Sequence, residues 1–553
     1  MNLHKYTMRA PWAFALALAA LPVAKAQDAA PAAPAPAASA AASPAPVEEV
    51  LLDILEFVVE GNTVLPTRDI ERALMPYLGP NRSFKDVESA RKALEDVYQR
   101  IGYQTVFVEV PEQRVNAGVI HLRVAEGRVE RTRVTGGQYF EQGQIRRAAS
   151  ELAEGSVPDF SKLQTQLAQL NRSADRQVAP VLRPGRTPGT VEVELSVKDR
   201  SPLHGDVELN NRASPFTTES RLNASIRYDN LWQRQHSFGL SVQTSPQKTS
   251  EVKLLVGTYL WNMADRPDVV SIYALRSKSG VSLVGGTTVL GDASIGGVRW
   301  ILPIIGGSEV QQTLSAGFDV KSFGQTKVVA GATEAPVLQS TVYSPLSLSY
   351  SGSRPSPGQL WQFSLTLNTA PPGVLGNSDE RFSSRRSVAR AGYVALKYEL
   401  SHESMLSKSV GSFIKIDGQF TDDPLIPNEQ ATLGGAESIR GYRESEVAGD
   451  RSFRGSAELR YFPWGAANAE QPTTAYVLGF FEGARAWLIE PLGPQAARSS
   501  IASTGFGLRV QNWRGFKLSA DAARALRNGL IGADGPVTKR GEWRGLVSVS
   551  YAF

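Results

Sequence analysis

The sequence contains no cysteine and few histidines, and each absence excludes a class of site. Without cysteine, the chain cannot be one of the small secreted domains that disulfides hold together. The five histidines are His4, His121, His204, His236 and His402. They are scattered along 553 residues, and none has the spacing of a metal-ligand set. The sequence therefore predicts no metal site and no cofactor.

Sequence motifs of the common enzyme classes are also missing. The chain has no G-x-S-x-G turn, no phosphate-binding loop and no zinc-binding helix motif. Adjacent carboxylates do occur at Asp422 and Asp423, but their segment "TDDPLIPNE" is turn-like, so we expect solvated loop charges there. The formal net charge of +5 is small for this length and does not indicate nucleic-acid binding. We therefore expect neither an enzyme nor a nucleic-acid-binding protein.

No apolar run is long enough for a transmembrane helix, which needs roughly 20 apolar residues. The longest run, "WAFALALAALPVA" at residues 12–24, follows Lys5 and Arg9 and ends in the small-residue pattern "AKA" before Gln27. This arrangement is typical of a secretory signal peptide, which we assign to residues 1–26. An exported chain without cysteine is expected in the periplasm or outer membrane of a bacterium.

Residues 27–50 consist mainly of Ala and Pro, with some Ser. Because this composition offers few large apolar groups to bury, and because proline keeps the backbone extended, it predicts a semi-rigid linker. We find no convincing amphipathic helix in it.

Residues 51–200 contain the same pattern of expected strands and helices twice. Each copy begins with a strand that ends at a glycine, Gly61 in the first copy and Gly136 in the second. Two amphipathic helices and two alternating strands follow in each copy. We therefore expect two β-α-α-β-β modules, at residues 51–126 and 127–200.

The use of these modules stays open at this point. They are either structural spacers or binding modules whose sheet edges accept an extended peptide as an additional strand. The segment "QTVFVEV", residues 104–110, is one such candidate edge, with the helix expected at residues 84–100 as the other wall of a groove.

From residue 201 onward the helical periodicity disappears and short alternating segments recur between polar loops. In "SFIKIDGQF", for example, Ile414 and Ile416 alternate with Lys415 and Asp417. An apolar face opposite a charged face is what a membrane barrel strand with a watery lumen requires. A soluble β-sandwich alternates as well, but the signal peptide and the length of this block disfavour it. At about 10 residues per strand plus turns and loops, residues 201–553 predict an antiparallel barrel of roughly 16 strands.

One segment of this region, "LGGAESIRGYRE" at residues 433–444, places an arginine among three glycines. Gly434 and Gly435 permit positive φ angles and close backbone approach, as a loop threaded past other walls requires. A guanidinium inside a partly dehydrated lumen needs a carboxylate partner, which it can bind with two parallel hydrogen bonds. Downstream, "GFFEGARAW" offers Glu482 as the expected partner of Arg440.

The repeated modules, the barrel and these two segments together resemble the polypeptide-transport-associated (POTRA) plus β-barrel superfamily. The resemblance is closest to its two-partner secretion transporters of the haemolysin activator/secretion type. It implies that a long loop, around residues 425–455, folds back into the lumen with a four-residue motif at its tip. It further implies a matching motif on the inner barrel wall. In this sequence a glutamate stands where aspartate is usual in that motif. The matching residues here are Ile439, Arg440, Gly441 and Tyr442 in the loop and Phe480 and Glu482 on the wall.

The resemblance also implies a function and a location. It predicts an outer-membrane pore with periplasmic modules that recognises a cognate exported protein and secretes it through the barrel. The alternative, from the sister branch, is an assembly factor that inserts other barrel proteins; its members usually carry more modules. The implied partners are the secreted protein, outer-membrane lipid and, through the carboxy-terminal Phe553, the barrel assembly machinery. The family often has an amino-terminal plug helix, which stays open here.

Overall fold

The computed structural model describes residues 51–553 except for short gaps. The predicted signal peptide, the linker and any plug helix lie outside the described residues. The gaps are residues 115–116, 216, 264–265, 279–280, 283–287, 290–291, 305–308, 328–336, 466–472, 494 and 533–534.

The first module packs two helices against a three-stranded sheet. Its sheet has the order β2-β5-β4, in which β2 is parallel and β4 antiparallel to the central β5. Helix α2 begins at a capping box, because the side chains of Ser83 and Asp86 bind each other's backbone N–H groups. Its apolar stripe, which includes Leu94, packs on Ile120 and Leu122 of β5. The elements are β1 (Leu52–Ile54), β2 (Glu56–Glu60), α1 (Thr67–Leu74), η1 (Met75–Tyr77), β3 (Gly79–Arg82), α2 (Phe84–Arg100), β4 (Val106–Glu109) and β5 (Val119–Glu126).

The second module repeats this topology. Its sheet has the order β6-β8-β7, again with one parallel and one antiparallel neighbour of the central strand. Gly61 and Gly136 both have positive φ, at 87° and 73°. A Cβ atom at either would collide with a carbonyl oxygen of the central strand, Val124 in the first module and Val197 in the second. The elements are β6 (Arg128–Gly136), α3 (Gln142–Ala148), η2 (Ser150–Leu152), α4 (Phe160–Leu170), β7 (Arg176–Pro184) and β8 (Thr190–Asp199).

The rest of the chain forms a closed antiparallel barrel of 16 strands, which confirms the expected strand number. Strands β20 and β21 pair in succession with β17 and count as one interrupted strand. The last strand, β33, pairs with the first, β9, and closes the barrel. The strands are β9 (Leu203–Asn210), β10 (Arg221–Leu231), β11 (His236–Thr244), β12 (Lys253–Asn262), β13 (Val269–Lys278), β16 (Ala293–Ile304), β17 (Gln311–Phe323), β20 (Thr341–Tyr343), β21 (Leu346–Ser356), β22 (Gln359–Thr369), β23 (Val394–Met405), β24 (Val410–Thr421), β27 (Arg451–Tyr461), β28 (Thr474–Trp487), β29 (Arg498–Trp513), β30 (Phe516–Ala525) and β33 (Trp543–Ala552).

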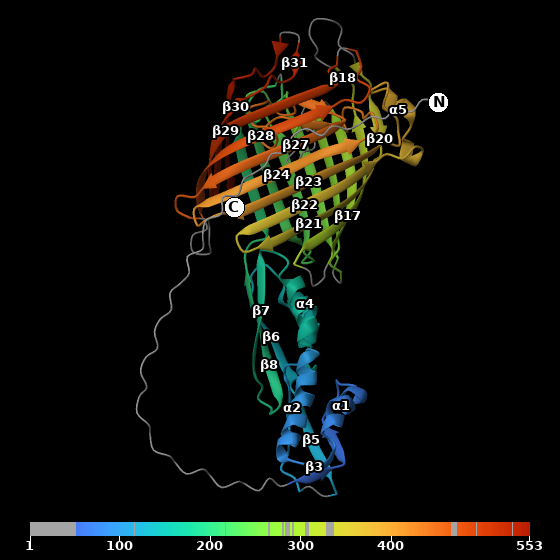
Figure 1. The fold of residues 1–553 in the computed structure, drawn as a ribbon, viewed down its shortest axis with the longest axis vertical. Coiled ribbons are helices and arrows are strands. Elements are labelled where there is room, and N and C mark those ends of the chain that lie inside the picture. The colour runs from blue at the N-terminus through green and yellow to red at the C-terminus, as the bar shows by residue number, and fades with distance from the viewer. Residues whose placement is uncertain are drawn as a thin grey trace, which may run out of the picture.

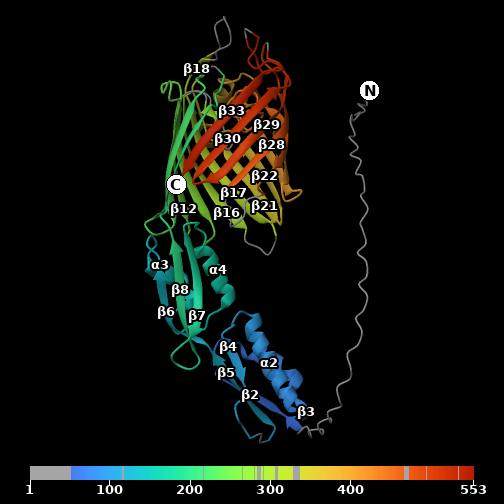
Figure 2. The ribbon, with the colours of Figure 1, turned by 90° about the vertical axis from the view of Figure 1, so that its left-hand side faces the viewer.

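The barrel strands are strongly tilted, and the two modules extend in line from one end of the barrel (Figures 1 and 2). The opposite end, called the far end below, carries the long connections and most of the short elements (Figure 1). These short elements are β14 (Val281–Ser282), β15 (Thr288–Val289), β18 (Thr326–Lys327), β19 (Val337–Leu338), η3 (Val374–Gly376), α5 (Asp379–Ser383), β25 (Ala431–Leu433), β26 (Val447–Gly449), β31 (Ile531–Gly532) and β32 (Gly535–Pro536).

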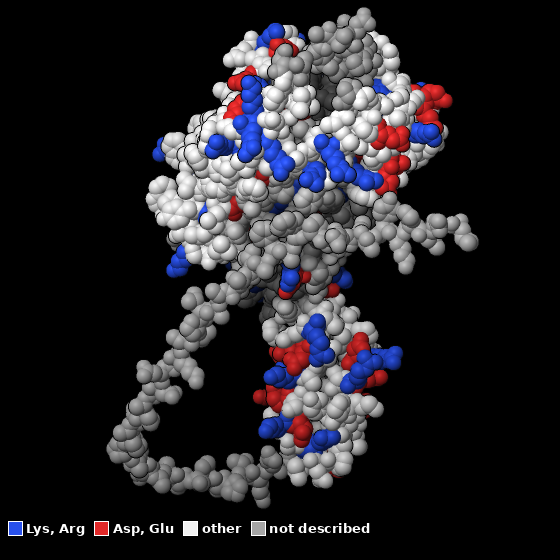
Figure 3. Space-filling model, turned by 45° about the horizontal axis from the view of Figure 1, so that its top comes forward, with Lys and Arg blue, Asp and Glu red and all other residues white. Residues whose placement is uncertain are grey.

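The barrel wall is apolar outside and charged inside. On β24, Ile414 and Ile416 face outward and are 49% and 39% exposed. Lys415 and Asp417 face inward, where Lys415 pairs with Glu399 of the next strand at 2.9 Å. Figure 3 shows charged side chains of both signs on the modules, whereas much of the adjoining barrel wall is uncharged. In the part of the chain that the structure describes, no helix has the length and apolarity needed to span a membrane.

Polar contacts join the second module to the barrel. The side chain of Gln233, in the turn between β10 and β11, accepts a hydrogen bond from the Glu141 N–H and donates one to the Tyr139 carbonyl. His204 of β9 lies 2.8 Å from the carboxylate of Asp175, which precedes β7. The first strand of the barrel is thereby tied to the second module.

Candidate functional site in the barrel lumen

The connection between β24 and β27 folds back into the barrel. It comprises residues 422–450, so it ends before the expected boundary at residue 455, because β27 begins at Arg451 as an ordinary wall strand. Two short strands, β25 and β26, pair at its base with Leu433 opposite Val447. Gly434 and Gly435 follow β25 with φ angles of 109° and 102°, which turn the chain into the tip of the loop.

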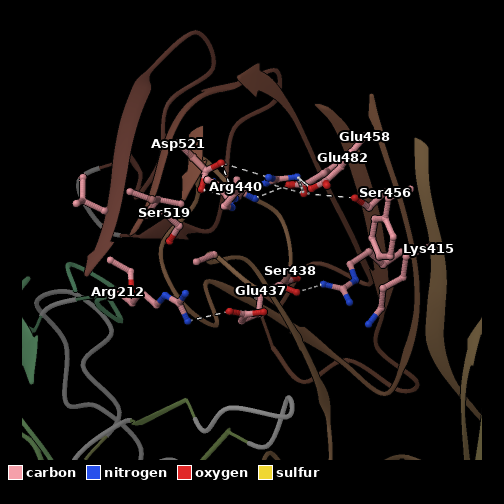
Figure 4. A pocket seen from close by; sticks show the side chains of 17 residues that line it. Arg212, Lys415, Glu437, Ser438, Arg440, Ser456, Glu458, Glu482, Ser519 and Asp521 are labelled. Carbon is pink, nitrogen blue, oxygen red and sulfur yellow. Dashed lines mark hydrogen bonds and ion pairs between the residues drawn. The ribbon is translucent and has the colours of Figure 1, made fainter. Parts of the chain in front are cut away.

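Arg440 at the loop tip binds Glu482 of β28 through both its backbone and its side chain (Figure 4). The backbone N–H donates to Glu482 Oε2 at 2.7 Å, and the guanidinium Nε donates to Oε1 at 2.8 Å. Both residues are only 3% exposed. An ion pair this deeply buried is stable only when its remaining hydrogen-bonding groups are also satisfied.

Two further carboxylates complete the surroundings of Arg440. Its Nη2 lies 2.7 Å from Glu458 of β27, and its Nη1 lies 3.3 Å from Asp521 of β30. Each of these acids has a second arginine partner on the wall, Arg460 for Glu458 and Arg509 for Asp521. Three cations therefore face three carboxylates, and only Arg440 comes from the loop.

Phe480 supports the guanidinium from the barrel wall. The Cζ atom of Arg440 lies 3.6 Å from the centre of the Phe480 ring, a close cation–π contact. Phe480 and Glu482 are two residues apart on β28, so both face the lumen. The wall motif thus contacts the same loop residue with a ring and a carboxylate.

The neighbours of Arg440 in the loop motif pack into the wall. Ile439 and Tyr442 are fully buried in an apolar cluster with side chains of β28, β29 and β30. The Tyr442 hydroxyl lies 2.9 Å from the carbonyl oxygen of Ala502 and 2.8 Å from that of Arg527. Gly441 has a φ of 93°, and a Cβ atom there would approach Ala523 to 3.3 Å. The whole four-residue motif therefore contacts one side of the lumen.

A cavity of about 280 Å³ adjoins the loop tip. Figure 4 shows Arg212 and Glu437 reaching toward each other across it, and their side chains form an ion pair at 2.8 Å. The cavity is lined by charged groups on both the loop and the wall. The loop tip therefore borders polar space on this side, whereas Ile439 and Tyr442 hold it to the wall through apolar contacts.

A second buried ion pair anchors the base of the same loop. Asp450, which is not exposed at all, accepts a hydrogen bond from Arg386 at 2.6 Å and another from the Ile489 N–H at 2.7 Å. Arg386 lies just after α5, in the connection between β22 and β23, and also donates to the Leu425 carbonyl. Three connections of the far end thus meet at one carboxylate.

Sequence reasoning identified Arg440 and Glu482 but missed Glu458, Asp521, Arg386 and Asp450. Glu458 and Asp521 each alternate with apolar neighbours on a strand, so an inward-facing acid could have been inferred at each. Nothing in the sequence relates Arg386 to Asp450.

Among the described residues, one group has the composition of a metal site: Asp175, His204 and Asp229, whose ligand atoms lie within 4.8 Å of one another. Both carboxylates already have arginine partners, because Arg200 contacts Asp175 and Arg227 contacts Asp229, each at 2.8 Å. The arrangement fits an ion-pair network at the module junction better than a cation site.

Two family models match parts of the chain. The model of the ShlB-type POTRA domain matches residues 52–127, and that of the haemolysin secretion/activation protein ShlB/FhaC/HecB matches residues 325–509. The outer membrane transporter CdiB of Dickeya dadantii is 25% identical over 73% of this chain and 71% of its own length. The heme/hemopexin transporter protein HuxB of Haemophilus influenzae strain 86-028NP is 20% identical over 87% of this chain and 84% of its own length.

Solved structures show the same fold. CdiB from Escherichia coli superposes with a TM-score of 0.64 at 18% identity, covering 92% of this chain and 91% of that chain. BamA from Haemophilus ducreyi, lacking its POTRA domains 1–3, superposes with a TM-score of 0.55 at 14% identity and covers 91% of this chain and 100% of that chain. These findings support a two-partner secretion transporter of the POTRA plus β-barrel type, an outer-membrane pore, with its POTRA region in the periplasm, that secretes a partner protein.

Proposed function

We propose that the loop of residues 422–450 closes the pore and that secretion requires the contacts of Arg440 both to break and to form again. The observation that supports this gate is the buried contact between Arg440 on a loop and Glu482 on the wall. Glu458 and Asp521 keep their wall partners Arg460 and Arg509 when the loop leaves, whereas Glu482 loses its cation. The function needs no catalytic residue.

We further propose that both modules are POTRA domains and that the first captures the exported protein in extended form. Strand β4 lies at the edge of its sheet, and Phe107 on it is 56% exposed. This edge is partly capped, because Glu95 of α2 accepts a hydrogen bond from the Val108 N–H and Arg91 donates to the Val108 carbonyl. A strand that adds here must replace these two side chains with its own backbone groups.

The test measures how much of its cognate exported protein the full chain secretes into the culture medium. Removal of residues 51–126 is expected to abolish secretion while the barrel still shows heat-modifiable migration on gels. The Glu95→Ala variant is expected to bind an amino-terminal fragment of the exported protein more tightly, because the edge of β4 is uncapped.

The matched control is Glu88→Ala, since Glu88 also pairs with Arg91 on α2 but forms no hydrogen bond or ion pair with β4 in the described structure. Unchanged secretion without residues 51–126 would exclude capture by the first module. A general loss of other barrel proteins from the outer membrane of a strain lacking the chain would instead indicate an assembly factor.

A further inference from the structure

Three arginines gather around Ser500 on the wall formed by β28, β29 and the segment after β30. Arg485 is the residue of β28 opposite Ser500 in the antiparallel register, and Arg498 lies two residues before Ser500 on the same face. Arg527 donates a hydrogen bond from its Nη1 to the Ser500 hydroxyl at 3.0 Å. Residues at directly opposed and next-but-one positions of a sheet are within about 4.5 to 8 Å of each other at Cβ, so the three side chains form one cluster.

This cluster faces outward, away from the lumen. Along β28, Glu482 points inward, so Arg485, three residues later, points to the other side. It shares that side with Val477 and Phe481, which are 47% and 57% exposed. Figure 3 shows several Lys and Arg side chains on the upper part of the barrel.

The cluster lacks the acidic partners that the lumen arginines have. Among the residues that the structure describes, neither Arg485 nor Arg498 forms an ion pair, and Arg527 has only Ser500 as its side-chain partner. The nearby outward residue Arg451 differs in this respect, because it pairs with Asp422. Three uncompensated guanidinium groups this close together repel one another, and an anion would relieve that repulsion.

The height of the cluster on the barrel indicates which anion it meets. Strand β28 ends at Trp487 and β29 begins at Arg498, so the cluster lies at the extracellular ends of both strands. The outward residues closer to the periplasm include the apolar side chains of Phe481 and Phe506. The arginines therefore lie at the boundary between the apolar belt and the outside, where the headgroups of the outer leaflet are found.

We propose that Arg485, Arg498 and Arg527 bind the phosphate groups of a phosphorylated lipid of the outer leaflet. Each guanidinium offers a planar set of donors that matches phosphate oxygens, and the Ser500 hydroxyl, which accepts from Arg527, can donate its own proton to the same phosphate. The site lies close to the loop tip, because the backbone carbonyl oxygen of Arg527 lies 2.8 Å from the Tyr442 hydroxyl.

The experiment uses the purified full chain in a neutral detergent with diphosphoryl lipid A as the probe, and the fully dephosphorylated lipid for comparison. Bound lipid is counted by native mass spectrometry across a concentration series. The wild-type protein is expected to prefer the phosphorylated lipid. The double variant R485Q/R498Q is expected to bind it about tenfold more weakly, since charge-assisted hydrogen bonds are lost.

The matched control is R234Q/R514Q, which removes two exposed arginines from turns at the periplasmic end of the barrel. Its binding is expected to be unchanged. Both double variants must show heat-modifiable migration, and the single variant R485Q serves if the double variant does not fold. Equal binding of both lipids by the wild type, or an unchanged affinity of the folded arginine variants, would overturn the proposal.

Discussion

Arg440 contacts three carboxylates, and these contacts are unequal. Glu482 receives hydrogen bonds from both the backbone and the guanidinium of Arg440, whereas Glu458 and Asp521 are shared with wall arginines. Removal of Glu482 therefore leaves Arg440 with two partial partners, whereas removal of Arg440 leaves Glu482 buried without a cation. The two substitutions are not expected to be equivalent.

The first prediction compares them in a double-mutant cycle on secretion and on urea stability. Breaking a buried ion pair lowers the free energy of unfolding by about 3 to 5 kcal/mol, and breaking an exposed pair lowers it by at most about 1 kcal/mol. Because the lumen contains water, we expect each single substitution to cost an amount between these limits. Arg440→Ala is expected to abolish secretion, Glu482→Ala to reduce it strongly, and the double variant to be scarcely worse than Arg440→Ala. Arg440→Lys is expected to rescue poorly, because an ammonium group cannot form the two-pronged contact.

Arg460→Ala is the matched control, since Arg460 pairs with Glu458 on the wall but is not part of the loop. Heat-modifiable gel migration verifies that every variant is inserted. Additive effects of the Arg440 and Glu482 substitutions would show that the two residues act separately.

Only part of the network around Arg440 could be predicted from the sequence. Arg440 and Glu482 could be predicted because each lies in a segment with a recognisable resemblance. Glu458 and Asp521 reach the same guanidinium from other strands, and that meeting depends on the strand register, which alternation alone does not specify. Arg386 and Asp450 meet because two irregular connections fold together, so no periodicity predicts their contact.

At the scale of elements, the modules could be predicted best. Their helices show a 3.6-residue period and their strands a two-residue period, and the duplicated glycines mark equivalent places. The loop was predicted as an element, but its end was placed near residue 455, whereas β27 begins at Arg451. The sequence pattern around Arg451 does not distinguish the base of a loop from the start of a strand.

The loop supplies the prediction at this scale. Leu433 and Val447 are the last paired residues of β25 and β26, so a two-residue Asn-Gly turn can replace residues 434–446. This replacement keeps the Arg386 and Asp450 anchor and removes the tip from the lumen. Single-channel conductance in planar bilayers is expected to rise, because the space occupied by the tip becomes open to ions.

A replacement of the same length by a polar sequence, in which Arg440 becomes Gln, is the control for chain length. If the shortened barrel is folded and its conductance stays at the wild-type value, the loop does not limit the pore.

At the scale of the whole molecule, the barrel is closed by the pairing of its first and last strands. Phe553 and Gly205 exchange two backbone hydrogen bonds, at 3.0 and 3.2 Å, and the Phe553 ring packs where a Gly205 side chain would lie. The sequence predicted Phe553 as a signal for the assembly machinery. The structure adds a second role, because the same residue extends the seam that closes the barrel.

The last prediction separates these two roles. If Phe553 contributes to closure, deletion of Phe553 should slow refolding from urea into phosphatidylcholine vesicles, where no assembly machinery is present. It should also lower the urea midpoint, because two backbone bonds worth about 0.5 to 1.5 kcal/mol each are lost. Phe553→Ala keeps the backbone bonds and is expected to have a smaller effect. Phe481→Ala, which removes an outward aromatic side chain on β28, three strands from β33, should leave refolding unchanged. Refolding of the deletion at the wild-type rate, together with a reduced amount in cells, would leave Phe553 with the recognition role alone.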